Sequence, residues 1–222
     1  MSQSCKDNII CPKCQTKGEF EYWSSINADL NPELKKKIFN EELFMWICPK
    51  CGAKVYVPYD TFYHDMAHKF MLFFTHDYPD EGEANESFEI PTVLGINKDY
   101  TFRSVHGIMS LKEKILILEN NLNDVAVEKL KYTITHHMEP SMSEKGIKLF
   151  FEGVTKPDDE DKYGRIVFYC QGVSDGKHQD IGLPMQQYYE QCLSLELDDR
   201  FNVKDCACVD EDWISNRMKG VE

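Results

Sequence analysis

The sequence lacks any stretch close to the roughly 18 consecutive apolar residues that a membrane-spanning helix needs. Its first residues, 1–7, also lack the apolar run of a secretory signal peptide. These two absences predict a protein without a membrane segment, located in the cytoplasm.

The common motifs of catalysis are missing as well. There is no glycine-rich dinucleotide fingerprint, no phosphate-binding P-loop and no Gly-x-Ser-x-Gly nucleophile turn. No cysteine and histidine stand in a recognisable arrangement for nucleophilic attack. The sequence therefore does not indicate an enzyme. An enzyme with an unrecognised site, in residues 99–222 or near His64 and His68, remains an alternative.

Positive charge is scarce. The formal net charge is −13, whereas a protein that binds nucleic acid needs a basic face to release counterions from phosphates. The one basic run, Lys35-Lys36-Lys37, is followed closely by two glutamates, which is more typical of a solvated helix face. A nucleic-acid partner is therefore not expected, although it stays open as an alternative because many cysteine-rich metal domains bind nucleic acid.

The sequence contains two Cys-Pro-Lys-Cys turns, Cys11-Pro12-Lys13-Cys14 and Cys48-Pro49-Lys50-Cys51. Two residues between paired cysteines let a tight turn direct both sulfurs at one ion, and proline stiffens that turn. Gly52 follows the second turn, where a left-handed residue often lets the chain leave. Four thiolates match the tetrahedral ligand set of a structural Zn²⁺. The predicted zinc ligands are Cys11, Cys14, Cys48 and Cys51, and redox pairs or bound iron are the alternatives.

The other five cysteines are Cys5, Cys170, Cys192, Cys206 and Cys208. An odd number of cysteines scattered among apolar segments suits a reducing compartment better than a disulfide framework. The close pair Cys206 and Cys208 is expected to be two partly buried thiols. Neither Cys-x-x-Cys turn follows a buried strand and begins a helix, the context of a thioredoxin-type redox pair, so zinc is favoured.

Strands are predicted beside both turns, because apolar, aromatic and β-branched residues flank them. The strand segments are residues 18–23, 43–47 and 54–57. Strand, turn and strand is the arrangement of a zinc ribbon. The two turns are farther apart than the roughly 15–20 residues of the simple pattern. A short inserted helix explains the excess, since Asn31-Pro32-Glu33 resembles a helix start and Leu34 and Ile38 share one helical face.

A helix is also predicted for residues 61–74, because apolar residues recur there at helical spacing. These residues are Phe62, Met66, Phe70 and Phe73. His64 and His68 fall on another face, four residues apart as in a metallopeptidase helix. The glutamate that follows the first histidine of that motif is missing, so a second metal site is not the expected outcome.

Several of these segments together resemble the CpXC family of bacterial zinc-ribbon proteins. The segments are the opening CPKC, the second CPKCG, Tyr63-His64-Asp65-Met66, Lys114-Ile115-Leu116-Ile117-Leu118-Glu119 and Leu122-Asn123-Asp124. The resemblance is clearest between Cys11 and about Phe74. It implies metal ligation by the four cysteines of the two turns, and it implies no activity.

Residues 77–98 are crowded with acidic side chains and contain prolines and glycines, which predicts a linker at a domain boundary. Helices and strands follow. Strands are predicted at residues 100–105, 148–155, 165–171 and 179–183, and helices after Ser110, up to about Glu139, from Pro184 and from Asp210. The helix that ends near Glu139 is expected to bury Val127, Leu130, Ile134 and Met138.

The sequence as a whole predicts an α+β protein. A zinc ribbon and its following helix occupy residues 1–76, an acidic linker occupies 77–98, and a mixed helix and antiparallel-sheet domain occupies 99–222. The expected role is non-catalytic: a structural zinc site in a cytoplasmic protein that binds another protein or a small ligand.

Overall fold

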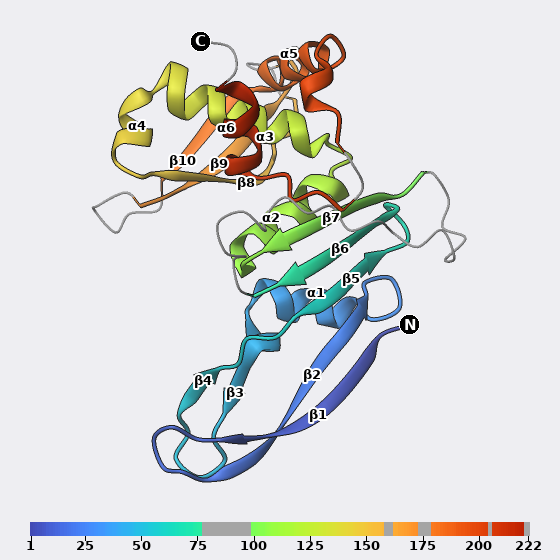
Figure 1. Cartoon of the computed structure of the whole chain (residues 1–222), viewed down its shortest axis with the longest axis vertical. Coiled ribbons are helices and arrows are strands. Elements are labelled where there is room, and N and C mark those ends of the chain that lie inside the picture. The colour runs from blue at the N-terminus through green and yellow to red at the C-terminus, as the bar shows by residue number, and fades with distance from the viewer. Residues whose placement is uncertain (77–98, 158–161, 173–178, 204–205, 220–222) are drawn as a thin grey trace. The chain divides into compact units, whose positions relative to one another are not determined.

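The computed structural model describes residues 1–76, 99–157, 162–172, 179–203 and 206–219 (Figure 1). The chain forms two compact units, Met1–Lys112 and Glu113–Glu222, and the division falls within helix α2 (Ile108–Glu119). The linker predicted for residues 77–98 lies outside the described residues. Mixed helix and sheet content confirms the predicted α+β class. Among the described residues, no helix is both long enough and apolar enough to cross a membrane.

The first unit is built on a five-stranded sheet in the order β1-β2-β5-β6-β7. Its strands are β1 (Gln3–Ile10), β2 (Lys17–Asn27), β5 (Thr61–Asp65), β6 (Phe70–Thr75) and β7 (Thr101–His106). The β1–β2 and β5–β6 pairs are antiparallel, whereas β2–β5 and β6–β7 are parallel. Strand β1 was not predicted, because its polar sequence has few of the residues that favour strands.

The connection from β2 to β5 carries a helix and a second hairpin. Helix α1 (Pro32–Phe39) begins after Asn31 and buries Leu34 and Ile38, as predicted. The Asn31 side chain donates to Glu33 Oε1 instead of capping the helix. A short turn, η1 (Glu42–Phe44), leads into the hairpin of β3 (Met45–Ile47) and β4 (Lys54–Tyr56).

The helix predicted for residues 61–74 is wrong: this segment is the β5–β6 hairpin. Burial alternates along β5, with Thr61, Tyr63 and Asp65 buried and the residues between them half-buried. Phe62 lies opposite Phe73, and their ring centroids are 4.9 Å apart. Apolar residues in this segment fit both the helical period and the strand period, and pairing with the distant strands β2 and β7 selects the strand.

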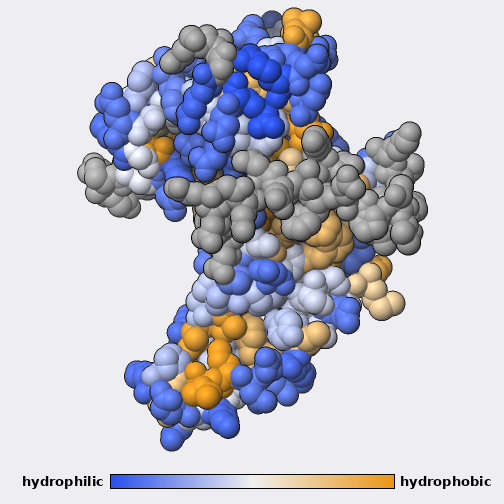
Figure 2. Space-filling model, viewed as in Figure 1, coloured by the Kyte–Doolittle hydropathy of each residue, from blue (hydrophilic) through white to orange (hydrophobic). Residues whose placement is uncertain are grey.

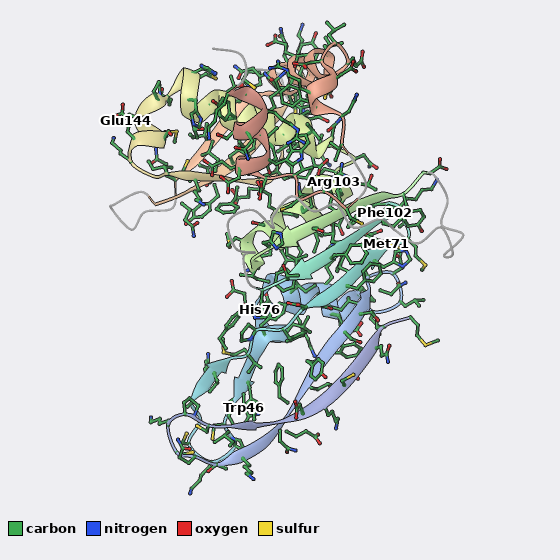
Figure 3. All side chains as sticks on the ribbon, in the orientation of Figure 1. Trp46, Met71, His76, Phe102, Arg103 and Glu144 are labelled. Atoms are coloured by element: carbon green, nitrogen blue, oxygen red, sulfur yellow. The ribbon has the colours of Figure 1, made fainter. Side chains whose placement is uncertain are left out.

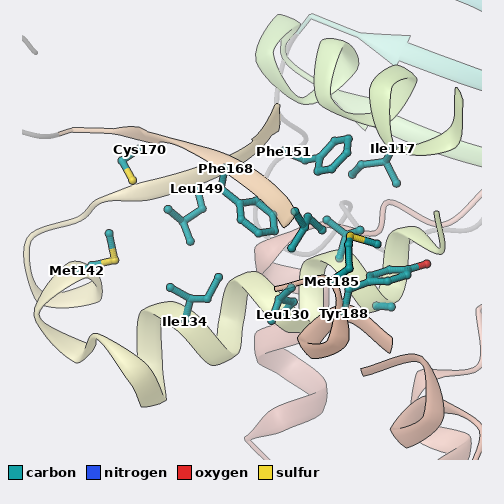
Figure 4. Close-up of a cluster of buried hydrophobic side chains, with 13 residues drawn as sticks. Ile117, Leu130, Ile134, Met142, Leu149, Phe151, Phe168, Cys170, Met185 and Tyr188 are labelled. Carbon is teal, nitrogen blue, oxygen red and sulfur yellow. The ribbon is translucent and has the colours of Figure 1, made fainter. Parts of the chain in front are cut away.

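The second unit packs helices against a three-stranded antiparallel sheet in the order β10-β9-β8. The strands are β8 (Lys148–Val154), β9 (Arg165–Gln171) and β10 (Asp180–Pro184), close to the predicted positions. The helices are α3 (Asp124–Thr133), α4 (Pro140–Glu144), α5 (Met185–Leu195), the short turn η4 (Asp199–Phe201) and α6 (Glu211–Met218). Figure 4 shows their shared core, in which Leu130, Phe151 and Phe168 are buried.

Helix α3 continues into a π-helical turn, η3 (Ile134–Met138), closed by the Glu139 N–H donating to Ile134 O at 2.7 Å. Val127, Leu130 and Ile134 are buried as predicted, but Met138 is 45 % exposed. The wider turn breaks the regular 3.6-residue period, so an apolar residue four positions after Ile134 leaves the core face.

The turn between β5 and β6 provides a test of the hairpin. Lys69 has a φ of +56°, where a β-carbon is strained and glycine is not. In the hairpin, Lys69→Gly is expected to be about 1 kcal/mol more stable than Lys69→Ala. If the segment were a helix, Lys69→Ala would instead be more stable than Lys69→Gly by about 1 kcal/mol. Both substitutions remove the exposed Lys69–Asp99 ion pair, so urea unfolding of the two variants isolates the backbone effect.

Candidate metal centre

The first cysteine turn is held by its own backbone. The Cys11 N–H donates to Thr16 O, and the Gln15 N–H donates to Cys11 O, both at 2.9 Å. Gln15 adopts a left-handed conformation with a φ of +59°. The turn therefore reverses the chain between β1 and β2 and directs both sulfurs to the same side.

The second turn repeats this geometry. The Cys48 N–H donates to Ala53 O, and the Gly52 N–H donates to Cys48 O, again at 2.9 Å. Gly52 has a φ of +67°, which confirms the left-handed residue predicted at this position. The left-handed residue stands four positions after the first cysteine in both turns.

The structure brings the four predicted ligands together. Their sulfur atoms all lie within 4.8 Å of one another. Cys11 Sγ is 3.6 Å from Cys51 Sγ, and Cys14 Sγ is 3.5 Å from Cys48 Sγ. Four sulfurs bound at about 2.3 Å around a tetrahedral ion stand about 3.8 Å apart. The cluster therefore has close to the dimensions that such an ion requires.

The thiols of the cluster differ in pKa. The Thr16 hydroxyl, 3.3 Å from Cys14 Sγ, and the Thr16 N–H lower the pKa of the Cys14 thiol to about 6. At Cys51, a backbone hydrogen bond from Ala53 lowers the pKa, but burial and the other three sulfurs raise it to about 12. Neighbouring thiolates repel one another, so a cation among them is needed before all four can be ionised.

A small apolar core supports the cluster. Cys11 and Cys48 are buried together with Phe20 and Trp46, and partly buried Tyr59 packs against them. The Trp46 side chain lies between β3 and β2 (Figure 3). Its ring packs against Gly18, where a β-carbon on residue 18 would clash with the ring. The Trp46 Nε1–H donates to Glu19 O at 3.1 Å. The two hairpins are thus packed face to face around the cysteines.

His64 and His68 lie on β5 and in the turn that follows it, not on one face of a helix as predicted. His64 Nε2 is 3.4 Å from Tyr100 Oη, and burial lowers its pKa. His68 Nδ1 is 3.0 Å from both oxygens of the buried Asp65.

Cys206 and Cys208 are both buried, close to the partly buried thiols that were predicted. The Cys208 thiol donates to Asp210 Oδ2 at 3.3 Å, and burial raises its pKa.

Sequence reasoning missed two groups of residues. The first is Thr16, whose hydroxyl acts on a cysteine two positions earlier in a turn that the sequence did not specify. The second is a set of buried charged side chains on α2 and α3 in the second unit. The sequence feature that could have revealed them is a charged residue at a helix position next to buried apolar residues. Glu113 and Lys114, which lie between the buried Leu111 and Ile115, are an example.

Comparison with known proteins gives one match. The sequence model of the CpXC family, described as CpXC protein, matches residues 9–131. No curated protein and no solved structure matches the sequence. The matched segment is more than half of the chain and contains both cysteine turns, so this protein, with its cluster of four potential metal-binding cysteines, belongs to the CpXC family.

Proposed function

We propose that Cys11, Cys14, Cys48 and Cys51 bind one Zn²⁺ ion and that the ion is structural. The observation that carries this proposal is the arrangement of four sulfurs within 4.8 Å of one another. Thiolates are soft ligands that favour Zn²⁺ over hard cations such as Mg²⁺ or Ca²⁺.

The ligand set argues against a catalytic ion. A catalytic zinc usually has three protein ligands and one position for water or substrate, whereas four thiolates complete the tetrahedral shell. Four thiolates with Zn²⁺ also give the centre a net negative charge, which weakens the ion as a Lewis acid. The ion therefore serves to hold the β1–β2 and β3–β4 hairpins together.

We further propose that the protein acts in the cytoplasm by binding another protein or a small ligand. None of the nine cysteines forms a disulfide, which supports a reducing compartment. A cavity of about 790 Å³ in the second unit is within the size range of small-molecule sites. Its lining includes Ile134, Met142, Ile181 and Leu183, with Glu139 and Lys145 among the polar members.

The surface of the ribbon supports a role in contacts. Figure 2 shows hydrophobic side chains gathered over the β3–β4 hairpin. Ile47, which directly precedes the second cysteine turn, is 58 % exposed. An aliphatic side chain exposed on a rigid hairpin suits a protein partner.

One observation favours nucleic acid as a second candidate partner. Four lysines in and beside the two cysteine turns are exposed: Lys13, Lys17, Lys50 and Lys54. They make the region around the two cysteine turns locally basic, although the whole chain has a net charge of −13. The overall charge and the negative zinc centre oppose phosphate binding, so this candidate ranks second.

Metal analysis tests the zinc site. Protein expressed without added metal is expected to contain one zinc ion per chain. Cys14→Ser is expected to lose most of it, because three thiolates and a hydroxyl are a much poorer ligand set. Cys5→Ser, a change at a cysteine outside the cluster, should retain full zinc. Equal zinc in the two variants would place the metal elsewhere.

Chelation tests the structural role. A strong chelator is expected to remove hydrogen-exchange protection from amides around Tyr22 and Trp46, because the apolar core of the ribbon is small. Amides around Val167, in the second unit with its own core, are expected to keep theirs. If both regions lose protection together, the two parts form one cooperative unit and the proposed domain boundary is wrong. If neither loses protection, the ion does not act as a support of the ribbon.

The charge argument predicts weak binding to nucleic acid. In a gel-shift titration with a short DNA duplex and a short RNA, no complex is expected at sub-micromolar protein. A tight complex that weakens steeply with salt and is lost when Lys13 and Lys50 are changed to Glu would make nucleic acid the partner.

A further inference from the structure

Five charged side chains are buried in the second unit, on neighbouring positions of helices α2 and α3. Their side chains are between 3 and 12 % exposed. They are Glu113, Lys114, Asp124, Glu128 and Lys131. Three are acids and two are lysines, so with every group ionised the cluster carries one uncompensated negative charge away from water. Such a charge is costly, and either a bound cation or a proton must offset it.

The first lysine, Lys114, forms an ion pair with one of the three acids, Asp124. Lys114 Nζ donates to Asp124 Oδ2 at 3.0 Å and to Val209 O at 2.8 Å. This pair is a one-to-one ion pair with an additional backbone acceptor. The excess negative charge therefore belongs to the other half of the cluster.

The second lysine is shared between two acids. Lys131 Nζ donates to both oxygens of Glu113, at 2.9 and 3.1 Å, and to Oε1 of Glu128 at 3.1 Å. Glu113 Oε1 also accepts the Phe151 N–H at 2.6 Å. The Glu113 carboxylate thus accepts three hydrogen bonds from two donor groups, and these bonds stabilise its ionised form.

Glu128 is the less satisfied of the two acids. Its Oε2 lies 3.0 Å from Lys131 Nζ as part of the ion pair, but this oxygen has no hydrogen-bond partner among the described residues. Glu128 also lines a small cavity of about 10 Å³, close to the space that one water molecule needs. The cavity is also lined by Lys131, Tyr132, Thr135 and Lys148.

We propose that Glu128 is a buried proton-binding site, whose carboxyl group holds a proton in the folded protein near neutral pH and releases it to solvent as the pH rises. The protonated carboxyl removes the uncompensated charge. Its O–H also supplies a donor at Oε2, which lacks a hydrogen-bond partner among the described residues, and the small cavity offers room for a water molecule as acceptor.

The surroundings of Glu128 agree with this assignment. Burial raises the pKa of Glu128 to about 7, and the negative charge of Glu113 also raises it. The positive charges of Lys131 and Lys114 lower this pKa but do not offset the effect of burial. Other charged or titratable groups near it are Lys148 of β8 and Glu211 of α6, which line the cavity, and Cys208, whose pKa is raised.

The direction of the pH effect follows from linkage. The folded pKa of Glu128 stands above the ordinary value of 4.5, so the folded state binds more protons than the unfolded state between these values. The stability that the bound proton contributes is fully present below about pH 4.5 and is lost as the pH rises through about 7. The second unit is therefore predicted to become less stable between pH 5.5 and pH 8.

The direct test is a carbon-13 NMR titration of the glutamate side-chain carboxyls in the full-length zinc protein. The Glu128 resonance is expected to titrate near pH 7. In Glu113→Gln, Lys131 faces one acid instead of two, so the Glu128 titration is expected to move to lower pH. A Glu128 titration at an ordinary value near 4.5, or one unmoved by Glu113→Gln, would overturn the proposal.

Unfolding provides an independent test. The urea midpoint of the second unit, followed by exchange of its amides, is expected to fall from pH 5.5 to pH 8 in the wild type. Glu128→Gln, which keeps the shape without the charge, is expected to lose most of this dependence. Glu144→Gln, a change at an exposed acid of α4, is expected to retain it. If Glu128→Gln retains the wild-type dependence, or if the dependence changes with the identity of the added salt cation, a proton does not compensate this charge.

Discussion

Four sulfur atoms within 4.8 Å of one another cannot all be ionised unless a cation lies among them. This constraint governs the ribbon, because the cysteines and a few apolar side chains pack together where the two hairpins meet. Trp46 and Phe20 seal one side of the cluster. The backbone turns at Gln15 and Gly52 set the directions of the sulfurs. The protein thus supplies the geometry, and the proposed ion would supply the charge balance.

The second unit solves a similar electrostatic problem by different means. It has a continuous apolar core between its sheet and its helices, and charged groups are buried at the edge of that core. Lysines take the place of a metal ion, but two lysines do not balance three acids. Under the two proposals above, a metal ion would balance the charge of the cysteine cluster in the first unit, and a proton on Glu128 would balance the charge of the buried acids in the second.

The sequence predicted that the four cysteines would come together, because the signal for this cluster is local. Paired cysteines with proline between them, a glycine after the second turn, and an inserted helix that buries Leu34 and Ile38 can all be recognised within a few residues. The contacts that hold the four cysteines in place could not be predicted from local sequence in this way. Trp46 packs on Gly18 only because two hairpins that are distant in sequence meet, and Thr16 acts on Cys14 only in one geometry of the turn.

The predicted helix at residues 61–74 shows where local reasoning fails. Phe62 and Phe73 fit one face of a helix as well as they fit a cross-strand pair. The deciding contacts come from β2 and β7, each paired in parallel with this hairpin and each far from it in sequence. The buried acids are a similar case. Lys131 of α3 binds both Glu128 of its own helix and Glu113 of α2, and this second contact depends on the packing of the two helices.

The inserted helix has a consequence for how the metal constrains the chain. Cys14 and Cys48 are 34 positions apart, so an ion that joins them acts as a cross-link that closes a long loop. By analogy with a disulfide, a cross-link of this span removes about 4 kcal/mol of conformational freedom from the unfolded chain. This quantity depends only on the logarithm of loop length, and doubling the loop changes it by about 0.6 kcal/mol. The segment between the two turns is therefore free to lengthen or shorten with little effect on the metal site, as long as its ends return to the same place.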